Sequence, residues 1–220
     1  MSGYYFWGVT SSALFLSAIP AILHQVRVIW GRKVLAAQGA LFEPVTQSIS
    51  LNQVFSSYCA VYSFFLFGLV SSSPDPFLTY PRMIVGLLLY LVIFELFQDR
   101  RAGAARTVFR LCSFSLILPV ILVATGVRAS PIAQGASNII VCIATLLMAQ
   151  GNISQYLILR RAKKRGAVSL PMHLALYAKD LAGMMFGLQI GPSAWSIVVM
   201  HASNLVLRAP IILSYMRSSR

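Results

Sequence analysis

The sequence has little charge and very few acidic side chains. Only 10% of its 220 residues are charged, whereas 58% are hydrophobic. Soluble domains carry about 25% charged and about 45–50% apolar residues, so this composition excludes an ordinary soluble domain. The acidic residues are Glu43, Asp75, Glu95, Asp99 and Asp180.

Metal-binding and catalytic motifs are also missing. Cys59, Cys112 and Cys142 lie inside apolar runs without a CxxC spacing, so neither a disulfide nor a zinc site is predicted. The three histidines stand at different estimated depths, which argues against a shared metal ion. No Gly-rich phosphate loop, HExxH or nucleophile elbow occurs. We therefore expect no metal, no cofactor and no enzymatic activity.

What the sequence does have is a formal net charge of +13. Five of its cations crowd into residues 160–165, within the stretch SQYLILRRAKKRGAVSL. A basic patch indicates nucleic-acid binding only on a soluble surface. Here the cations separate two apolar segments, so we expect contact with the headgroups of a lipid bilayer and no nucleic acid. The N-terminus MSGYYFWGVTSS lacks a basic region and does not resemble a cleavable signal peptide.

Seven apolar segments are long enough to cross a bilayer, which requires about 20 residues in a helix. They cover residues 4–30, 51–70, 77–97, 106–126, 132–159, 169–190 and 192–216. The loops after the first, third and fifth segments carry most of the cations, whereas the opposite side carries Arg128. The positive-inside rule then places the N-terminus outside and the C-terminus in the cytoplasm. The predicted class is an all-α, multi-pass integral membrane protein, in the cell membrane or an organelle membrane.

The two ends of the chain follow the same plan. Each has a long helix, a basic loop, a second helix, a short outer loop and a final helix. Tyr58 and Tyr177 stand eight residues after the equivalent Ser50 and Ser169. Because the fourth span restores the chain direction, both triplets point the same way, as a parallel 3+1+3 repeat. The predicted parts are a first three-helix repeat (1–100), a linker helix (101–130) and a second three-helix repeat (131–220).

The first helix of each repeat is long and contains a weak point. Pro20 removes a backbone hydrogen bond, and Gly151 loosens the helix. Gln25 and Gln155 follow at matching positions near the ends of these helices. Pro20, Gly151, Gln25 and Gln155 are the predicted hinge residues.

The second triplet resembles the PQ-loop repeat, which SWEET sugar transporters and lysosomal amino-acid exporters share. Over about 65 residues, Gln155, the basic loop, Val168-Ser169-Leu170 and Asp180 fall at the spacing of that repeat. Ser154 stands where the family has the proline of Pro-Gln, and Lys179 where it has the glycine of Gly-Asp. The first triplet resembles the repeat more weakly. The resemblance implies a seven-helix transporter fold.

Asp180 is the main candidate for a functional side chain, because ionisable groups at membrane depth are costly. Helical spacing places it on one face with His173, Tyr177, Gly183 and Gly187. It is interpreted either as a protonatable carboxylate on a solute path or as the partner of a cation such as Arg208. Its neighbour Lys179 points about 100° away around the helix and is not expected to pair with it.

The last span has a second polar face, formed by His201, Asn204 and Arg208. Asn204 is predicted to bind solute, as an asparagine does in SWEET-like repeats, or to make an interhelical hydrogen bond. Arg208 could hold a carboxylate or phosphate, pair with Asp180, or extend toward the cytoplasm. His201 is assigned either to proton transfer or to a structural hydrogen bond.

Further candidates lie on the other helices. In the fifth span, Asn138 belongs to a polar face that either lines the cavity or packs against a neighbour. In the first repeat, Tyr58, Tyr62 and Tyr90 are candidates for the cavity wall. Glu95 is expected to extend toward the cytoplasmic headgroups.

The leading hypothesis is a transporter of a small polar solute, such as an amino acid, a sugar or a similar metabolite. The solute would bind between the triplets, which would alternate in access, with Asp180 carrying a coupling proton. Substrate-binding candidates are Asn204, Tyr177, Tyr58, Asn138 and Arg208, and proton-coupling candidates are Asp180 and His201. The alternative is a receptor or adaptor of the same fold, like the KDEL receptor. The sequence leaves the oligomeric state open, with a homo-oligomer among the options.

Overall fold

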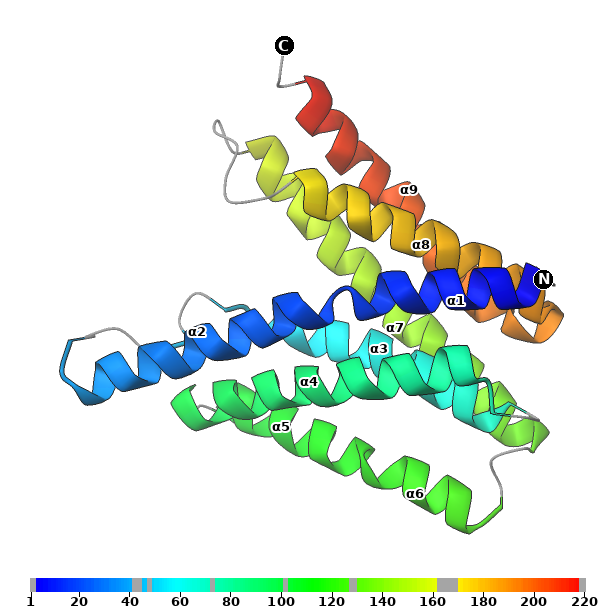
Figure 1. Cartoon of the computed structure of the whole chain (residues 1–220), viewed down its shortest axis with the longest axis horizontal. Helices are drawn as coiled ribbons and strands as arrows, with labels where there is room; N and C mark the ends of the chain where they lie inside the picture. The colour runs from blue at the N-terminus through cyan, green and yellow to red at the C-terminus, as the bar shows by residue number, and fades with distance from the viewer. Residues whose placement is uncertain are drawn as a thin grey trace. The chain divides into compact units, whose positions relative to one another are not determined.

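The computed structural model describes residues 3–40, 45–46, 49–71, 74–100, 103–126, 130–161 and 170–217. Within these ranges the side chains at 154–155, 158–161, 170–173, 211 and 214–217 are outside the description. The elements are α1 (Gly3–Leu16), α2 (Ile19–Ala37), α3 (Leu51–Val70), α4 (Pro76–Arg100), α5 (Gly103–Ser115), α6 (Ile117–Ala124), α7 (Pro131–Arg161), α8 (Leu170–Ile190), the short 3-10 helix η2 (Pro192–Ala194) and α9 (Trp195–Arg217) (Figure 1).

Helices occupy all seven ranges in which membrane spans were predicted. Five helical stretches of the described residues are long and apolar enough to cross a bilayer. They are Gly3–Ala37, Leu51–Val70, Pro76–Arg100, Gly103–Ala124 and Pro131–Ile153. The helices α8 and α9 coincide with the two remaining predicted spans. The protein is therefore an all-α, multi-pass integral membrane protein.

The chain forms two compact units. Unit 1 contains Met1–Phe15 and Gly135–Arg220, and unit 2 contains Leu16–Gln134. Unit 1 thus holds α1, most of α7, α8 and α9, whereas unit 2 holds α2 to α6. The division into residues 1–100, 101–130 and 131–220 follows the sequence repeat and stays a prediction.

In unit 2, α3 and α4 form an antiparallel hairpin (Figure 1). Asp75 caps the start of α4, since its Oδ1 accepts hydrogen bonds from the backbone N–H of Phe77 at 2.9 Å and of Leu78 at 3.1 Å. Gly68 lets the helices approach closely, because a Cβ there would lie 2.7 Å from Leu78 Cβ and 2.8 Å from Thr79 Oγ1. The turn and the glycine together fix the hairpin.

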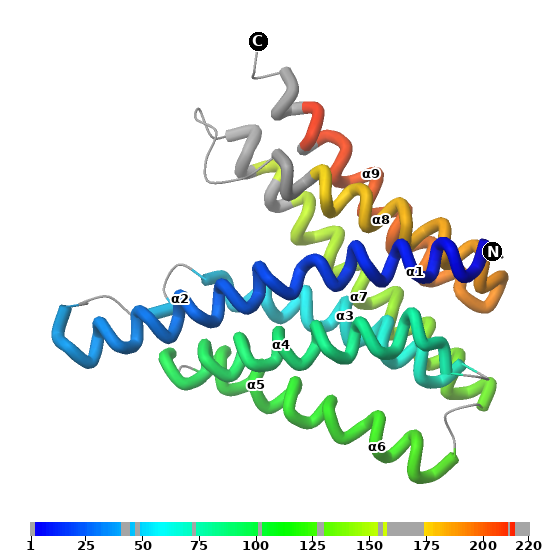
Figure 2. Tube along the Cα trace, viewed as in Figure 1, coloured from blue at the N-terminus to red at the C-terminus, as the bar shows by residue number. Residues whose placement is uncertain are grey.

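Proline interrupts the first long helix where the sequence predicts it. Pro20 has no N–H for the carbonyl of Leu16, four residues earlier, and α1 ends at Leu16. A turn at Ser17 and Ala18 follows, and the N–H of Ile22 then donates to the carbonyl of Ala18 at 3.1 Å to start α2. α1 and α2 are therefore two separate helices that follow each other along the chain, which Figure 2 traces in successive shades of blue.

Two other prolines in unit 2 leave carbonyls that side chains satisfy. Pro81 cannot donate to Phe77 O, and the guanidinium of Arg82 donates to that oxygen instead. Pro119 cannot donate to Ser115 O, and the hydroxyl of Tyr62 on α3 donates to this oxygen at the end of α5. An unsatisfied carbonyl is costly in a membrane, so these side chains permit proline inside a span.

Aromatic rings join α4 to α5. Phe109 stacks on Phe97 with ring centroids 4.6 Å apart and planes 3° apart, and it also contacts Tyr90 and Phe94. Such ring pairs add about 0.5–1.5 kcal/mol each beyond their burial.

In unit 1, α1 runs along α8 and α9 packs against α8. Tyr4 contacts Phe186 with ring centroids 5.4 Å apart, and Lys179 Nζ lies 5.8 Å from the centroid of Phe15. The α8–α9 turn is made at Gly191, whose φ of 102° favours glycine.

Candidate functional site

A cluster of charged side chains is buried between α8 and α9. Asp180 has no exposed surface, and its Oδ1 lies 3.0 Å from Nδ1 of His201 and 3.6 Å from Nζ of Lys179. Its Oδ2 lies 3.3 Å from Nε of Arg208. We call Asp180, Lys179, His201 and Arg208 the charge cluster.

A glycine makes room for this cluster. A Cβ on Gly183 would lie 2.3 Å from Nε2 of His201, so only glycine lets α9 bring the imidazole to Asp180. Gly187, one turn on, similarly faces Ile197 and Val198. The small-residue pattern noted in the sequence thus has a physical reason, because it sets the helix separation that the His201–Asp180 contact needs.

The cluster contains more positive than negative groups. A single carboxylate faces two permanent cations and one histidine. Among the described residues, Asp180 Oδ2 and Arg208 Nε have no hydrogen-bond partner, although they face each other. Both atoms are buried, so their contact is an ion pair without a hydrogen bond.

Two predictions about the partners of Asp180 can be compared with this geometry. The pairing with Arg208, left open as one alternative, is confirmed. The prediction that Lys179 would not pair with Asp180 is wrong. A lysine has four rotatable side-chain bonds, so it can curl back toward a neighbour whose Cβ points elsewhere.

Paired amides continue the polar surface within unit 1. Nδ2 of Asn152 on α7 donates to Oδ1 of Asn204 on α9 at 3.1 Å. The hydroxyl of Ser196 donates to Oδ1 of Asn138 at 2.5 Å. Both asparagines named in the sequence as solute contacts thus also make interhelical hydrogen bonds, which was the stated alternative for Asn204.

The two candidate tyrosines lie in different units. Tyr177 is half-buried on α8, about one turn before Asp180. Tyr58 is buried in unit 2, where its hydroxyl lies 2.7 Å from Oγ of Ser115 and its ring stacks on Tyr62. Unit 1 contains Asp180, His201, Arg208, Asn204 and Asn138, of which His201 and Arg208 both contact Asp180. Solute binding by Tyr58 and Tyr177 stays a prediction.

The predicted hinge residues have unequal surroundings. Pro20 follows the break between α1 and α2, whereas α7 runs through Gly151 without interruption. Gln25 is half-buried on α2. The side chain of Gln155 lies outside the described residues, as do the side chain of His173 and the Val168-Ser169 pair. The hinge role of Pro20, Gly151, Gln25 and Gln155 stays a prediction.

The structure also corrects the expectation for Glu95 and adds Arg82 to the buried charges. Glu95 does not extend toward headgroups. It is buried and accepts from Nε1 of Trp30 at 2.8 Å and from Nζ of Lys33. Arg82, only 2% exposed, was not singled out from the sequence. The Pro81-Arg82 pair in the sequence indicates this contact, because an arginine directly after a proline inside an apolar span needs a nearby hydrogen-bond acceptor.

Within the described ranges, no group of three or more His, Cys, Asp or Glu side chains is placed to hold a metal ion. The charge cluster contributes two such residues, too few for a protein-built site.

Comparison with known proteins gives one informative match. No protein-family model matches the chain, and no curated protein matches it by sequence. A 3.7 Å structure of a eukaryotic SWEET transporter is similar in fold, with a TM-score of 0.66 at 14% sequence identity. The match covers 99% of this chain and 98% of that chain. The chain thus has the fold of a SWEET transporter along its full length.

Proposed function

We propose that this protein is a transporter of a small polar solute, and that the charge cluster of unit 1 takes part in holding it. The observation that carries the proposal is the fully buried Asp180, with two cations and a histidine as neighbours, inside a multi-pass membrane fold. Charges at this depth are costly and are retained at solute and ion pathways. The full-length similarity in fold to a SWEET transporter supports the same class of function.

The excess of positive charge indicates which solutes fit. Arg208 and Lys179 together outweigh the one carboxylate, so a solute carrying a carboxylate or another anionic group would balance the cluster. The amide and hydroxyl groups of Asn204, Asn138 and Ser196 would add neutral hydrogen bonds. An amino acid or a small organic acid meets this description better than a plain sugar.

Proton coupling would operate at the Asp180–His201 pair. The two side chains are 3.0 Å apart, within reach of a shared proton. The exchangeable proton of this proposal is one shared by the carboxylate of Asp180 and the imidazole of His201, and Arg208 and Lys179 lie against the same carboxylate. Departure or arrival of a solute anion at Arg208 would change the field on His201 and thereby couple proton binding to solute binding.

Uptake into proteoliposomes tests this proposal. Wild-type protein should accumulate a labelled amino or organic acid, and an imposed proton gradient should increase the initial rate. Asp180→Asn should abolish the response to the gradient, because the partner of His201 loses its charge. Asn204→Leu, which removes only a neutral amide, should reduce uptake while the response to the gradient persists. Uptake unaffected by Asp180→Asn would contradict the role of the cluster.

The receptor alternative predicts a different result in the same preparation. A receptor would bind a ligand saturably in detergent and show no counterflow when reconstituted. Binding of this kind, lost in Asp180→Asn, would place the charge cluster in a binding site and reject transport.

A further inference from the structure

We propose a second binding site, for a phosphate-bearing ligand, at the ends of α2 and α4 in unit 2. An open cleft of about 600 Å³ lies there, lined by Lys33, Phe97, Gln98, Asp99 and Arg106. All five residues stand at helix ends, which in a multi-pass membrane protein lie at the level of the lipid headgroups. The volume falls within the range of small-molecule sites.

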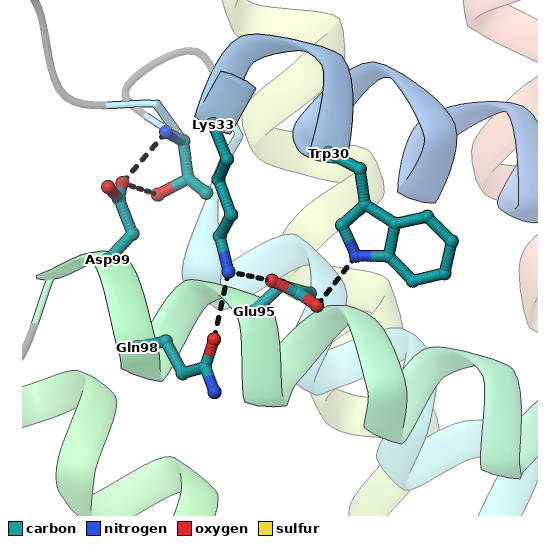
Figure 3. A network of polar contacts seen from close by, with 6 residues as sticks. Trp30, Lys33, Glu95, Gln98 and Asp99 are labelled. Atoms are coloured by element: carbon teal, nitrogen blue, oxygen red, sulfur yellow. Dashed lines mark hydrogen bonds and ion pairs between the residues drawn. The ribbon is translucent and has the colours of Figure 1, made fainter. Parts of the chain in front are cut away.

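The cleft is held open by a polar network (Figure 3). Nζ of Lys33 reaches from α2 to Glu95 and donates to Oε1 of Gln98 at 2.8 Å. Asp99 accepts from the backbone N–H of Thr46 at 2.8 Å and from its hydroxyl at 2.6 Å. These bonds fix one wall of the cleft, so its shape is set before any ligand arrives.

The acidic groups of this wall are already neutralised within the protein. Glu95 is paired with Lys33, and Asp99 has the guanidinium of Arg100 beside it, bonded to the same Thr46 hydroxyl. Arg106, exposed on the first turn of α5, makes no ion pair among the described residues. The cleft therefore has surplus positive charge.

A phosphate group fits this arrangement. The planar guanidinium of Arg106 can bind two phosphate oxygens, and Nζ of Lys33, already bonded to Glu95 and Gln98, lines the same cleft from the facing helix. The amide nitrogen of Gln98 can donate a neutral hydrogen bond. The ring of Phe97, fixed by its stack on Phe109, offers an apolar surface for the neighbouring part of the ligand.

Two sources of the phosphate are distinguishable by experiment. Thermal unfolding of the purified chain in detergent would be recorded with dioctanoyl phosphatidylglycerol, dioctanoyl phosphatidylcholine, glycerol phosphate and inorganic phosphate. Stabilisation by phosphatidylglycerol alone would identify a lipid headgroup site. Equal stabilisation by glycerol phosphate or inorganic phosphate would identify a soluble phosphate ligand.

Matched variants decide whether the cleft is responsible. Arg106→Gln should weaken the apparent affinity about tenfold. Arg110→Gln removes the same charge one turn along α5, outside the cleft lining, and should leave the affinity unchanged. Glu95→Gln should strengthen binding about threefold, because Lys33 loses its internal counter-charge. No stabilisation by any phosphate, or equal losses in Arg106→Gln and Arg110→Gln, would overturn the proposal.

Discussion

The hairpins α3–α4 and α8–α9 occupy equivalent places in the sequence repeat. They differ in the side chains at three equivalent buried positions. Three residues after the equivalent Tyr58 and Tyr177 stand Val61 and Asp180. In α3–α4, Val85 and Val92 stand nine and sixteen residues after Pro76. In α8–α9, His201 and Arg208 stand at the same distances after the equivalent Pro192.

All six of these residues are buried. At these three positions α3–α4 is closed with valines, so charged residues are not a requirement of the repeat there. Replacing buried ion pairs by well-packed hydrophobic residues is often neutral or stabilising. This comparison supports the proposed solute-binding role of the charges in α8–α9.

The largest expected effect comes from replacing Asp180 on α8 by valine, the residue at the equivalent position 61 of α3. Asp180→Val leaves Arg208 and Lys179 buried without their carboxylate and should lower the free energy of unfolding by about 3–5 kcal/mol. The triple variant Asp180→Val, His201→Val, Arg208→Val copies the valines of α3–α4 and should recover most of that loss while abolishing uptake. Unfolding in detergent and uptake would be measured side by side. A triple variant less stable than Asp180→Val would show that the cluster is structural.

The glycines at the two helix contacts should show the next largest effect. Gly68→Ala places a Cβ 2.7 Å from Leu78 Cβ and 3.1 Å from the backbone nitrogen of Thr79, and should cost about 1–3 kcal/mol of unfolding free energy. Gly183→Ala should instead displace the His201 side chain and remove the response of uptake to a proton gradient.

Gly86→Ala is the control for both substitutions. Its nearest neighbour would be Val61 Cγ1 at 3.6 Å, an ordinary contact, so stability and uptake should stay near wild-type values. If Gly86→Ala costs as much stability as Gly68→Ala, close helix approach is not the cause.

The smallest expected effect concerns a hydrogen bond of unit 2, from the hydroxyl of Tyr62 to the carbonyl of Ser115 between α5 and α6. Tyr62→Phe keeps the stack on Tyr58 but removes the hydroxyl that donates to Ser115 O, and should cost about 1–2 kcal/mol of unfolding free energy. In a Pro119→Ala background the restored N–H can serve that carbonyl, so the same substitution should cost little. An equal cost in both backgrounds would mean that the hydroxyl does not replace the missing N–H.

The sequence predicts the spans well and the contacts between them poorly. Apolar length specifies a spanning helix, and Pro20 marks the break between α1 and α2 because a missing N–H acts locally. Asp180 can be singled out from the sequence because a carboxylate in an apolar span is energetically costly. Glu95 was misassigned because its partner Lys33 lies 62 residues away in the chain, and only packing brings the two together. Lys179 was misassigned because helical spacing fixes Cβ directions and not the ends of long side chains.

The cap that Arg82 places on its own helix has a consequence for assembly in the membrane. Arg82 and the carbonyl of Phe77 belong to the same helix, so α4 can enter the bilayer with this hydrogen bond already made. The partner of Arg208 lies on α8, and α9 therefore exposes an uncompensated charge to lipid until α8 is beside it. Insertion assays on single segments should register this difference. At Arg82, α4 thus needs no neighbouring helix for this hydrogen bond, whereas Arg208 on α9 gains its partner only when α8, which precedes it in the chain, lies beside it.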